Sequence, residues 1–251
     1  MLAILPILIC VVGSIVAARL SLYVRHRGVM ASGFVPDTTR DIQNLYIEQW
    51  WMNITRDNQA EYARLHNFRY QWLDKLSSGN ALFFLKMSFF ETLLLPLHTA
   101  APSALFWNDI DSVFLNNSIS VWPLIERCAA AGQSVIAARE CRPANGDFYN
   151  QVMSGNMIVL PQIGGIRLRE FLVEWRKKTV AYKAQGAFNA DQNAFNDLLF
   201  YNTRFQSLLC AQSDAVFMTY DNCAKRQRGA LIMHFPGHHK PERIREWLQA
   251  K

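Results

Sequence analysis

The stretch FWNDIDSVFLN, residues 106–116, places two acids between apolar residues. Phe106 and Trp107 close the run SALFW, whose continuous apolar character predicts a buried strand. Asp109 and Asp111 follow at once, and side chains two residues apart in an extended chain point to the same side. Two neighbouring carboxylates repel one another, and a buried unpaired charge is costly. The spacing therefore predicts either a solvated polar turn or a pair of acids that share a cation.

Short apolar runs and helical patterns alternate through the rest of the chain. Further strands are predicted at FRYQWL (68–73), SVIAAR (134–139), NMIVLP (156–161), AVFMTY (215–220) and ALIMHF (230–235). Helices are predicted at 58–66, 81–97, 166–185, 191–200 and 241–249, and in the helix 166–185 we expect Ile166, Phe171, Leu172 and Trp175 to face inward. Such alternation indicates an α/β fold with a sheet covered by helices on both faces. Ligands of these sheets lie beyond the carboxyl ends of strands, where Asp109, Asp111 and His234 are placed.

The composition is that of a well-cored globular chain: of 251 residues, 51% are hydrophobic and 18% charged. The formal net charge of +6 makes the surface basic, which suits nucleic acid, anionic lipid or a phosphorylated substrate. No nucleic-acid motif is present, so we expect no nucleic-acid partner.

The N-terminus differs from the rest, because Leu2–Ala18 carries no charge and the apolar character continues to Val24. About 20 apolar residues are enough to cross a bilayer, and the segment lacks the basic start and small-residue exit of a cleaved signal peptide. We therefore expect a transmembrane anchor at 2–24. A polar, Gly- and Pro-containing stem is expected at 25–40, and one domain at 41–251.

The sequence gives two opposing signals for the orientation of this anchor in the membrane. Arg19, Arg25 and Arg27 follow the span, which by the positive-inside rule would leave the body in the cytosol. Two glycosylation sequons, at Asn53 and Asn116, favour a lumenal body instead. The remaining cysteines, Cys128, Cys141, Cys210 and Cys223, permit either two disulfides or four buried thiols.

Two other kinds of site also contain closely spaced acids. A calcium-binding EF-hand loop is excluded, because Val113 stands where the third oxygen ligand is required. A haloacid-dehalogenase-like phosphatase fits the pattern DIDSV, but that motif opens its domain, whereas here more than 60 globular residues precede it. That family also needs a later pair of acids at a strand end, and the segment around Asp221 offers one.

The surrounding blocks resemble the galactosyl/mannosyltransferase family of Golgi enzymes. The resemblance rests on six blocks in the family's order, which together span about residues 57–240: NQAEYARLHNFRY, FLKMSFFETLL, FWNDIDSVFLN, SGNMIVLPQIGGIRLREFLVEW, ADQNAFNDLL and MHFPGHHK. Jointly these blocks are far more specific than the Asp-x-Asp pair alone.

The resemblance implies a GT-A fold and a metal-dependent, retaining transfer of a hexose or pentose from a UDP- or GDP-sugar to a glycan. By this resemblance Asp109, Asp111 and His234 hold Mn²⁺, and Asp191 and Gln192 lie beside the reacting sugar carbon. The donor-binding residues implied are Asp109, Gly155, Asn156, Gly237 and Lys240, with His239 as another source of positive charge near the phosphates. The family also implies a single-pass type II protein of the Golgi membrane with a lumenal catalytic domain.

Several positions depart from the family pattern. The cysteine expected after the H-F-x-G motif is His238, and Ala190 replaces an acid before the Asp–Gln pair. The first nucleotide-binding strand, expected in 41–54, has no good match there. A non-catalytic subunit of a glycosyltransferase complex is therefore kept as the alternative, and the sugar is not named.

Overall fold

The computed structural model describes residues 27–33, 42–73, 82–94, 102–141, 148–187, 189–221, 223, 229–236 and 240–249. The expected anchor at 2–24 and Gly237, with His238 and His239, lie outside these residues. Among the helices that are described, none combines the length and the apolar character needed to span a bilayer.

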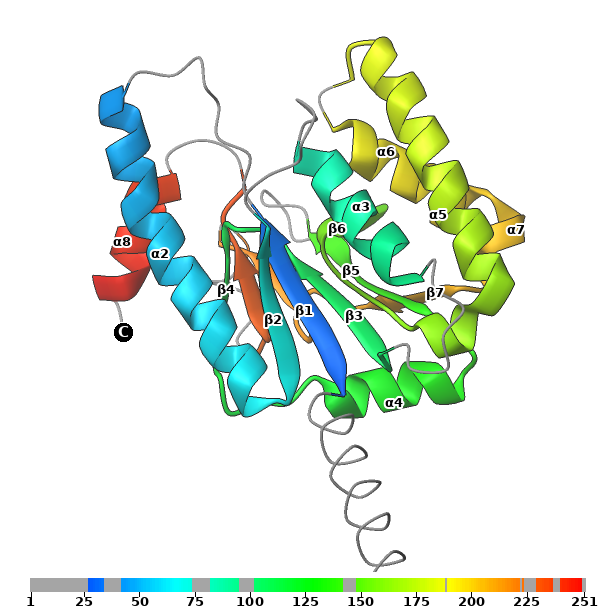
Figure 1. The fold of residues 1–251 in the computed structure, drawn as a ribbon, viewed down its shortest axis with the longest axis horizontal. Helices are drawn as coiled ribbons and strands as arrows, with labels where there is room; N and C mark the ends of the chain where they lie inside the picture. The colour runs from blue at the N-terminus through cyan, green and yellow to red at the C-terminus, as the bar shows by residue number, and fades with distance from the viewer. Residues whose placement is uncertain are drawn as a thin grey trace, which may run out of the picture.

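A mixed six-stranded sheet forms the centre of the molecule, in the order β2-β1-β3-β6-β5-β7 (Figure 1). Its strands are β1 (Gly28–Gly33), β2 (Phe68–Leu73), β3 (Ala104–Asn108), β5 (Val135–Cys141), β6 (Phe148–Val159) and β7 (Leu209–Gln212). β1 runs parallel to both β2 and β3, while β6 is antiparallel to β3 and β5. The carboxyl ends of β1 and β3 therefore meet at one edge, which is where the site is built.

Helices cover both faces of this sheet. One face packs against α3 (Leu82–Leu94), α5 (Pro161–Ala184) and α6 (Ala190–Asn196), and α6 continues into the π-helical turn η1 (Asp197–Tyr201) and α7 (Thr203–Gln206). The other face packs against α4 (Trp122–Ala130) and the C-terminal part of α2 (Ile42–Leu65). The layering confirms the α/β fold class expected from the alternating pattern.

A second, three-stranded sheet lies beside the first in the order β4-β9-β8. Its strands are β4 (Ser112–Phe114), β8 (Met218–Tyr220) and β9 (Ile232–His234). A third hydrophobic cluster joins this sheet to α2 and to the closing helix α8 (Lys240–Gln249). The small sheet thus brings the C-terminal part of the chain next to the two acids.

The stem expected over 25–40 is wrong for residues 28–33, because these residues form β1, a fully buried inner strand. Its small residues make room for the strand's neighbours. A side-chain carbon on Gly28 would lie 2.6 Å from the ring of Phe68, and one on Gly33 would lie 2.3 Å from the side chain of Leu85. The first nucleotide-binding strand, expected in 41–54, is not found there, because residues 42–65 form the helix α2. The domain already includes β1 and therefore begins before residue 41.

The other predicted strands and helices occur at the expected places with different bounds: α2 and β6 are longer than predicted, whereas β8 and β9 are shorter. The elements β4, α4 and β7 were not predicted. Phe171, Leu172 and Trp175 face the core, as predicted. Ile166 does not, since 77% of its surface is exposed. The helix is kinked at Gly165 (φ 51°, ψ −134°). The side chains on the two sides of the kink therefore do not share the faces of one straight helix.

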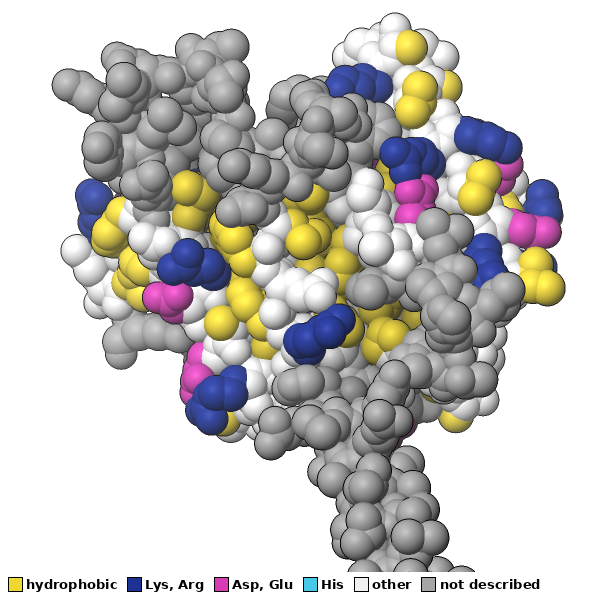
Figure 2. Space-filling model, in the orientation of Figure 1, with side chains coloured by type: hydrophobic (Ala, Val, Ile, Leu, Met, Phe, Trp, Pro, Cys, Tyr) yellow, Lys and Arg dark blue, Asp and Glu magenta, His cyan; other side chains and the backbone are white. Residues whose placement is uncertain are grey.

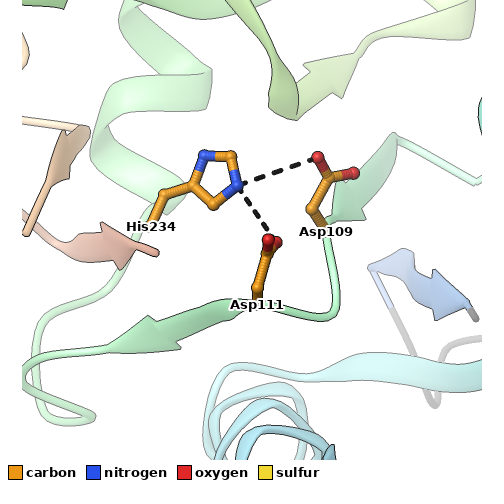
Figure 3. Close-up of side chains that lie close together, drawn as sticks. All are labelled: Asp109, Asp111 and His234. Carbon is orange, nitrogen blue, oxygen red and sulfur yellow. Dashed lines mark ion pairs between the residues drawn. The ribbon is translucent and has the colours of Figure 1, made fainter. Parts of the chain in front are cut away.

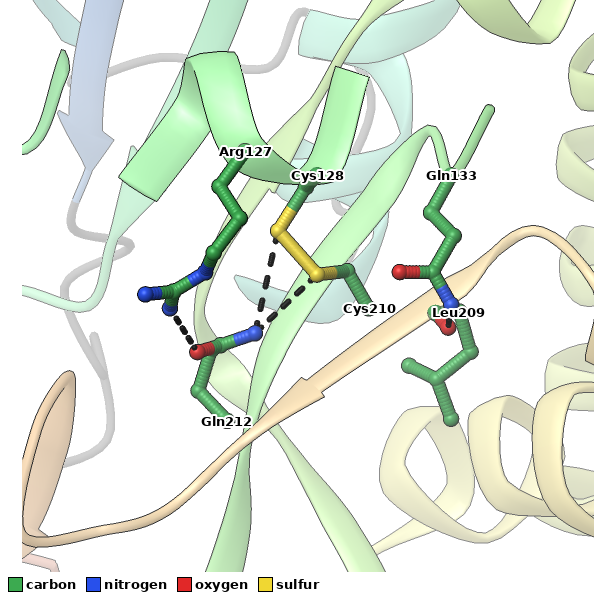
Figure 4. The surroundings of a disulfide bond; sticks show 6 residues. All are labelled: Arg127, Cys128, Gln133, Leu209, Cys210 and Gln212. Atoms are coloured by element: carbon green, nitrogen blue, oxygen red, sulfur yellow. Dashed lines mark hydrogen bonds between the residues drawn. A yellow bond between two sulfur atoms is a disulfide. The ribbon is translucent and has the colours of Figure 1, made fainter. Parts of the chain in front are cut away.

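A disulfide between Cys128 of α4 and Cys210 of β7 ties two distant parts of the chain together (Figure 4). Gln212 lies against it, donating from Nε2 to the Cys210 sulfur at 3.0 Å and accepting from Arg127 at 2.8 Å. Of the two alternatives left open for the cysteines, the structure therefore supports disulfide formation for this pair.

Candidate active site

The two acids sit on the tight connection between β3 and β4. The amide of Asp109 donates to the carbonyl of Gly155 on β6 at 2.8 Å, and the amide of Ser112 donates back to the carbonyl of Asp109 at 3.1 Å. Buried Gln59 of α2 closes the turn, because its Nε2 donates to the carbonyls of Asp109 (3.0 Å) and Ser112 (2.8 Å). The backbone that carries both carboxylates is thus fixed from two sides.

His234 completes the cluster from the small sheet (Figure 3). It is the last residue of β9 and pairs with Ser112 of β4. Its Nε2 lies 3.0 Å from Asp111 Oδ1 and 4.0 Å from Asp109 Oδ2, and one ligand atom from each of the three residues lies within 4.8 Å of the others. The structure therefore brings together the three residues expected to bind metal, although His234 lies more than 100 positions after the two acids in the chain.

The net pKa shift differs between the two carboxyls. Burial raises the pKa of Asp109 above its ordinary value, and the neighbouring Asp111 adds to this effect against the opposing charge of Lys86. Burial would also raise the pKa of Asp111, but His234 and Lys240 outweigh it and lower that pKa. In the absence of a bound cation, Asp111 is the better-compensated anion of the pair.

The residues present fit a divalent cation. Two carboxylate oxygens and one imidazole nitrogen form a donor set suited to Mn²⁺ and similar ions. Gly155 borders the same space, because a side-chain carbon there would lie 2.8 Å from Asp109 Oδ2 and 3.0 Å from His234 Cε1. Because residue 155 has no side chain, there is space next to the Asp109 carboxylate and the His234 ring.

Lys240, expected near the donor phosphates, lies at the site. It begins α8 and forms an ion pair with Asp111 Oδ2, on the opposite oxygen from His234. Asn156, also expected to contact the donor, is fully buried and donates to Ser112 Oγ at 2.9 Å. Asn156 therefore links β6 to β4 behind the acids in this structure.

A second ion cluster adjoins the first and centres on Lys86 of α3. This lysine is only 3% exposed, and its Nζ donates to the carbonyl of Ser154 at 2.8 Å and to Asp191 Oδ2 at 3.0 Å. The same Nζ lies 3.7 Å from Asp109 Oδ1. Lys86 thus links the cluster of possible metal ligands to Asp191. No role was assigned to it from the sequence, although a single lysine within an apolar helix was the available signal.

Asp191 and Gln192 open α6, and the structure holds both in place. The carbonyl of Asp191 accepts from Trp175 Nε1 at 2.9 Å. Gln192 uses both ends of its amide on β6: it accepts from the Ser154 amide at 2.7 Å and donates to the Val152 carbonyl at 2.6 Å. Burial would raise the pKa of Asp191, but the charge of Lys86 and hydrogen bonds to its carboxylate lower it, so Asp191 is held ionised.

The phosphatase pattern finds no support at Asp221. That carboxylate is bound by Arg243 of α8, with Nε 2.5 Å from Asp221 Oδ2, and Arg243 also donates to the carbonyl of Pro236 at 2.7 Å. Asp221 therefore anchors α8 next to His234 and does not join Asp109 and Asp111 in the cluster of possible metal ligands.

Comparison with known proteins finds a similar fold among solved structures but no similar sequence. No family model matches the chain, and no curated protein sequence does. Among solved structures, a glycosyltransferase involved in the glycosylation of the major capsid of PBCV-1 superimposes with a TM-score of 0.59 at 13% identity, covering 88% of this chain and 98% of that one. The galactosyltransferase LgtC, in complex with donor and acceptor sugar analogues, gives 0.49 at 13% identity, covering 88% and 95%. The chain therefore has a GT-A-like α/β fold over most of its length, shared with the capsid glycosyltransferase.

Proposed function

We propose that this protein is a metal-dependent, retaining glycosyltransferase that moves a hexose or pentose from a UDP- or GDP-sugar to a glycan acceptor. The observation that carries the proposal is the convergence of Asp109, Asp111 and His234 at the carboxyl edge of a GT-A-like sheet. The resemblance of the sequence blocks to Golgi galactosyl/mannosyltransferases supports the finer assignment.

The metal centre would hold the donor. Asp109, Asp111 and His234 are the residues that would bind Mn²⁺, and such an ion neutralises the charge that gathers on a departing diphosphate. Lys240 already lies against Asp111, so its ammonium is placed to bind a phosphate oxygen next to the acids. Gly155 keeps the ligand atoms uncrowded, and Gly237, outside the described residues, is proposed to let the backbone approach the phosphates.

The transfer itself would use Asp191. Its ionised carboxylate stabilises the positive charge that develops on the sugar carbon as the bond to the diphosphate breaks. The acceptor oxygen forms the new bond on the same face, and its proton passes to the departing phosphate, so the configuration is retained. Lys86 keeps Asp191 charged, and Gln192 holds the start of α6 in register with β6.

The proposed location is the Golgi membrane, with an N-terminal anchor and a lumenal domain. Three features support it: the apolar segment 2–24, the Cys128–Cys210 disulfide, which suits an oxidising compartment, and the exposed sequon at Asn116. Protease treatment of sealed microsomes tests this orientation, because a lumenal domain is protected until detergent is added, whereas a cytosolic one is digested without it.

The alternative is a non-catalytic subunit of a glycosyltransferase complex. The observation in its favour is that Lys240 and Lys86 compensate the acids with positive charge from within the chain. The departures at Ala190 and His238 point the same way. The two functions differ in whether metal and nucleotide bind.

Thermal unfolding with Mn²⁺ and UDP or GDP decides between them. Ligands that bind only the folded state at a hundredfold excess over Kd stabilise it by about 2.7 kcal/mol. We expect the unaltered protein to respond and to hydrolyse or transfer at least one donor sugar, while Asp111→Asn and His234→Ala do neither. Asp197→Asn, a carboxylate bound by Lys178 and Tyr182 away from the cluster, is the matched control and should respond normally.

Two results would overturn the proposal in different ways. If the unaltered protein responds and both site variants respond equally, these residues are not the site. If the unaltered protein shows no response to any metal and nucleotide pair, the non-catalytic function is favoured.

A further inference from the structure

The domain begins almost directly after the segment proposed as the membrane anchor. That apolar segment runs to Val24. Arg27 is already fixed in the domain, because its amide donates to the Asn67 carbonyl and its carbonyl accepts from the Ser103 amide, both at 3.0 Å. Three peptide links join Val24 to Arg27, and a fully extended chain spans at most about 11 Å over that length. The layer of lipid headgroups is itself about 5–8 Å thick. An anchor at 2–24 would therefore hold Arg27 in or just above the headgroups.

The chain enters the domain at one edge of the main sheet. Gly28 of β1 is aligned with Phe68 of β2 and with Ala104 of β3, and each is the first residue of its strand. β6 runs the other way, and its last residue, Val159, pairs with Val135, the first residue of β5. The amino ends of β1, β2, β3 and β5 therefore lie level with the carboxyl end of β6, and we name this edge the amino edge. α2 and α4 end at the amino edge, and α5 begins there (Figure 1).

The inner position of β1 fixes how the domain sits over such an anchor. β1 has β2 on one side and β3 on the other, and helices cover both faces of the sheet. The attachment point is thus surrounded by the rest of the amino edge. A domain that lay on its side would raise this point above the lipid by more than the diameter of a helix, about 10–12 Å. Beyond the headgroups the connection spans only about 3–6 Å. The amino edge therefore has to face the bilayer.

The side chains of the amino edge suit a lipid surface. Large apolar side chains are exposed where α2 ends and where α5 begins, at Leu65, Ile163 and Ile166. Exposed arginines lie on the same helices, on α4 and at the strand ends: Arg27, Arg64, Arg69, Arg127 and Arg167. Figure 2 shows basic side chains over the lower ends of α2 and β2. Apolar side chains bordered by basic ones are typical of protein surfaces that rest on a bilayer.

The acidic side chains of this region do not cancel its positive charge. Among the described residues of the amino edge, the acids are Glu61 and Glu126, and each is held in an ion pair by one of these arginines. The next turn of α5 and the neighbouring α7 add two positive charges and one negative charge, on Arg169, Arg204 and Glu170. Positive charge therefore exceeds negative charge at the amino edge, which favours anionic headgroups.

We propose that the amino edge rests on the lipid headgroups and that the candidate active site opens on the side away from the bilayer. Asp109 follows the carboxyl end of β3, five residues after Ala104, which places it about 17 Å beyond the amino edge. This orientation favours as acceptor a glycan that is carried well above the lipid surface. The inference rests on the proposed anchor at 2–24 and holds for either side of the membrane. It does not rest on metal binding or sugar transfer.

The short connection also selects lipid over a protein partner at this surface. A partner protein that covered the amino edge would have to fit between the domain and the bilayer. The thinnest such layer is one helix, about 10–12 Å across, whereas only about 3–6 Å of connection remains beyond the headgroups. Lipid is therefore the occupant that the chain length allows.

The test places a fluorescent label on single introduced cysteines of the full-length chain in lipid vesicles that contain phosphatidylserine. Leu65→Cys, Ala130→Cys and Arg167→Cys put the label at three exposed points around the start of β1, on α2, α4 and α5. Gln185→Cys is the matched control, because this exposed residue follows the other end of α5, about 27 Å along the helix from residue 167. The unaltered chain, with its five native cysteines, sets the background.

A quencher attached to the lipid headgroups, which acts only at short range, reports which labels lie at the membrane surface. We expect the three labels at the amino edge to lose most of their fluorescence and the label of Gln185→Cys to lose little. Flotation of the same vesicles reports the anchor separately, because an anchored chain floats with the lipid whichever way its domain is turned. Neither measurement requires metal or a donor sugar, so both are independent of the proposed activity.

Four outcomes contradict the proposal. If the chain floats but no label at the amino edge is quenched, this edge is turned away from the lipid or covered by something else. Quenching of only one of the three labels indicates a domain that lies tilted on one helix. Equal quenching of Gln185→Cys indicates that the domain lies on its side. A chain that does not float with the vesicles has no anchor, and the inference falls with it.

Discussion

At the scale of single residues, the organising feature is Lys86, a buried ammonium between two carboxylates. It donates to Asp191 and lies 3.7 Å from Asp109, so one positive charge serves both the proposed metal-ligand cluster and the proposed catalytic acid. Burial would lower the pKa of Lys86, but Asp109 and Asp191 outweigh it and raise that pKa, so the lysine stays charged.

Removing this cation should be costly. We expect Lys86→Met to lower the free energy of unfolding by about 3–5 kcal/mol, because buried carboxylates are left uncompensated. Arg64→Met, which breaks an exposed pair with Glu61, should leave the stability almost unchanged, because solvent screens such pairs. Urea denaturation of both variants measures the difference. Adding Asp191→Asn to Lys86→Met should return part of the loss, and a strictly additive double variant would contradict the coupling.

The ionisation of Asp191 gives a prediction for pH. Because its pKa is lowered in the folded protein, its charge contributes stability above the unfolded pKa of about 3.9, and this contribution is lost as pH falls through the lowered folded value. The stability gap between the unaltered protein and Asp191→Asn should therefore be constant above about pH 5 and shrink below about pH 4. Urea titrations from pH 3.5 to 7 measure it. A gap that widens toward acid would show that Asp191 is held protonated.

At the scale of elements, β1 shows how a strand can be missed in a sequence. Its residues, GVMASG, contain a single β-branched side chain and two glycines, and they lie within a polar, Pro-containing segment. A central position between two parallel partners supplies the stability that intrinsic preference does not.

A substitution in residues 28–33 can test whether they form a buried strand or an exposed stem. Ala31→Asp would bury a charge in a fully buried strand, so we expect the domain to unfold or to lose several kcal/mol of stability. Arg69→Asp, on the exposed face of the adjacent β2, is the control and should stay within about 1 kcal/mol of the unaltered protein. Far-ultraviolet circular dichroism and thermal melts compare the two. If the two variants are equally stable, residues 28–33 belong to an exposed stem, as the sequence alone predicts.

Other elements were predictable because their signals are local. The apolar run before Asp109 and the periodic face of Phe171, Leu172 and Trp175 specify a strand and a helix without tertiary information. The outward position of Ile166 was not predictable, because it depends on a kink at Gly165. Two of the metal-ligand candidates follow from their own spacing, whereas His234 was found through a motif, and its approach to Asp111 depends on the pairing of β4 with β9.

At the scale of the whole molecule, the Cys128–Cys210 disulfide closes a loop with a sequence separation of 82. A cross-link of this length restricts the unfolded chain, and such bonds typically contribute about 2–5 kcal/mol. We expect Cys128→Ala to lower stability by this amount. Cys128→Ala with Cys210→Ala should cost little more, because the first substitution already breaks the bond. Urea unfolding of the single and double variants measures both, and full additivity would argue against the pairing.

The inner position of β1 also has a consequence for biosynthesis. Among the strands that the structure describes, β1 is synthesised first, and its partners follow much later: Gly28 pairs with Phe68 and with Ala104, so the second partner is made about 76 residues later. At elongation rates of about 5–20 residues per second, the nascent chain carries an incompletely paired strand for roughly 4–15 seconds. During that interval its backbone donors and acceptors are open to other chains, so the yield of this protein should depend on how well a chaperone shields β1 until β3 emerges.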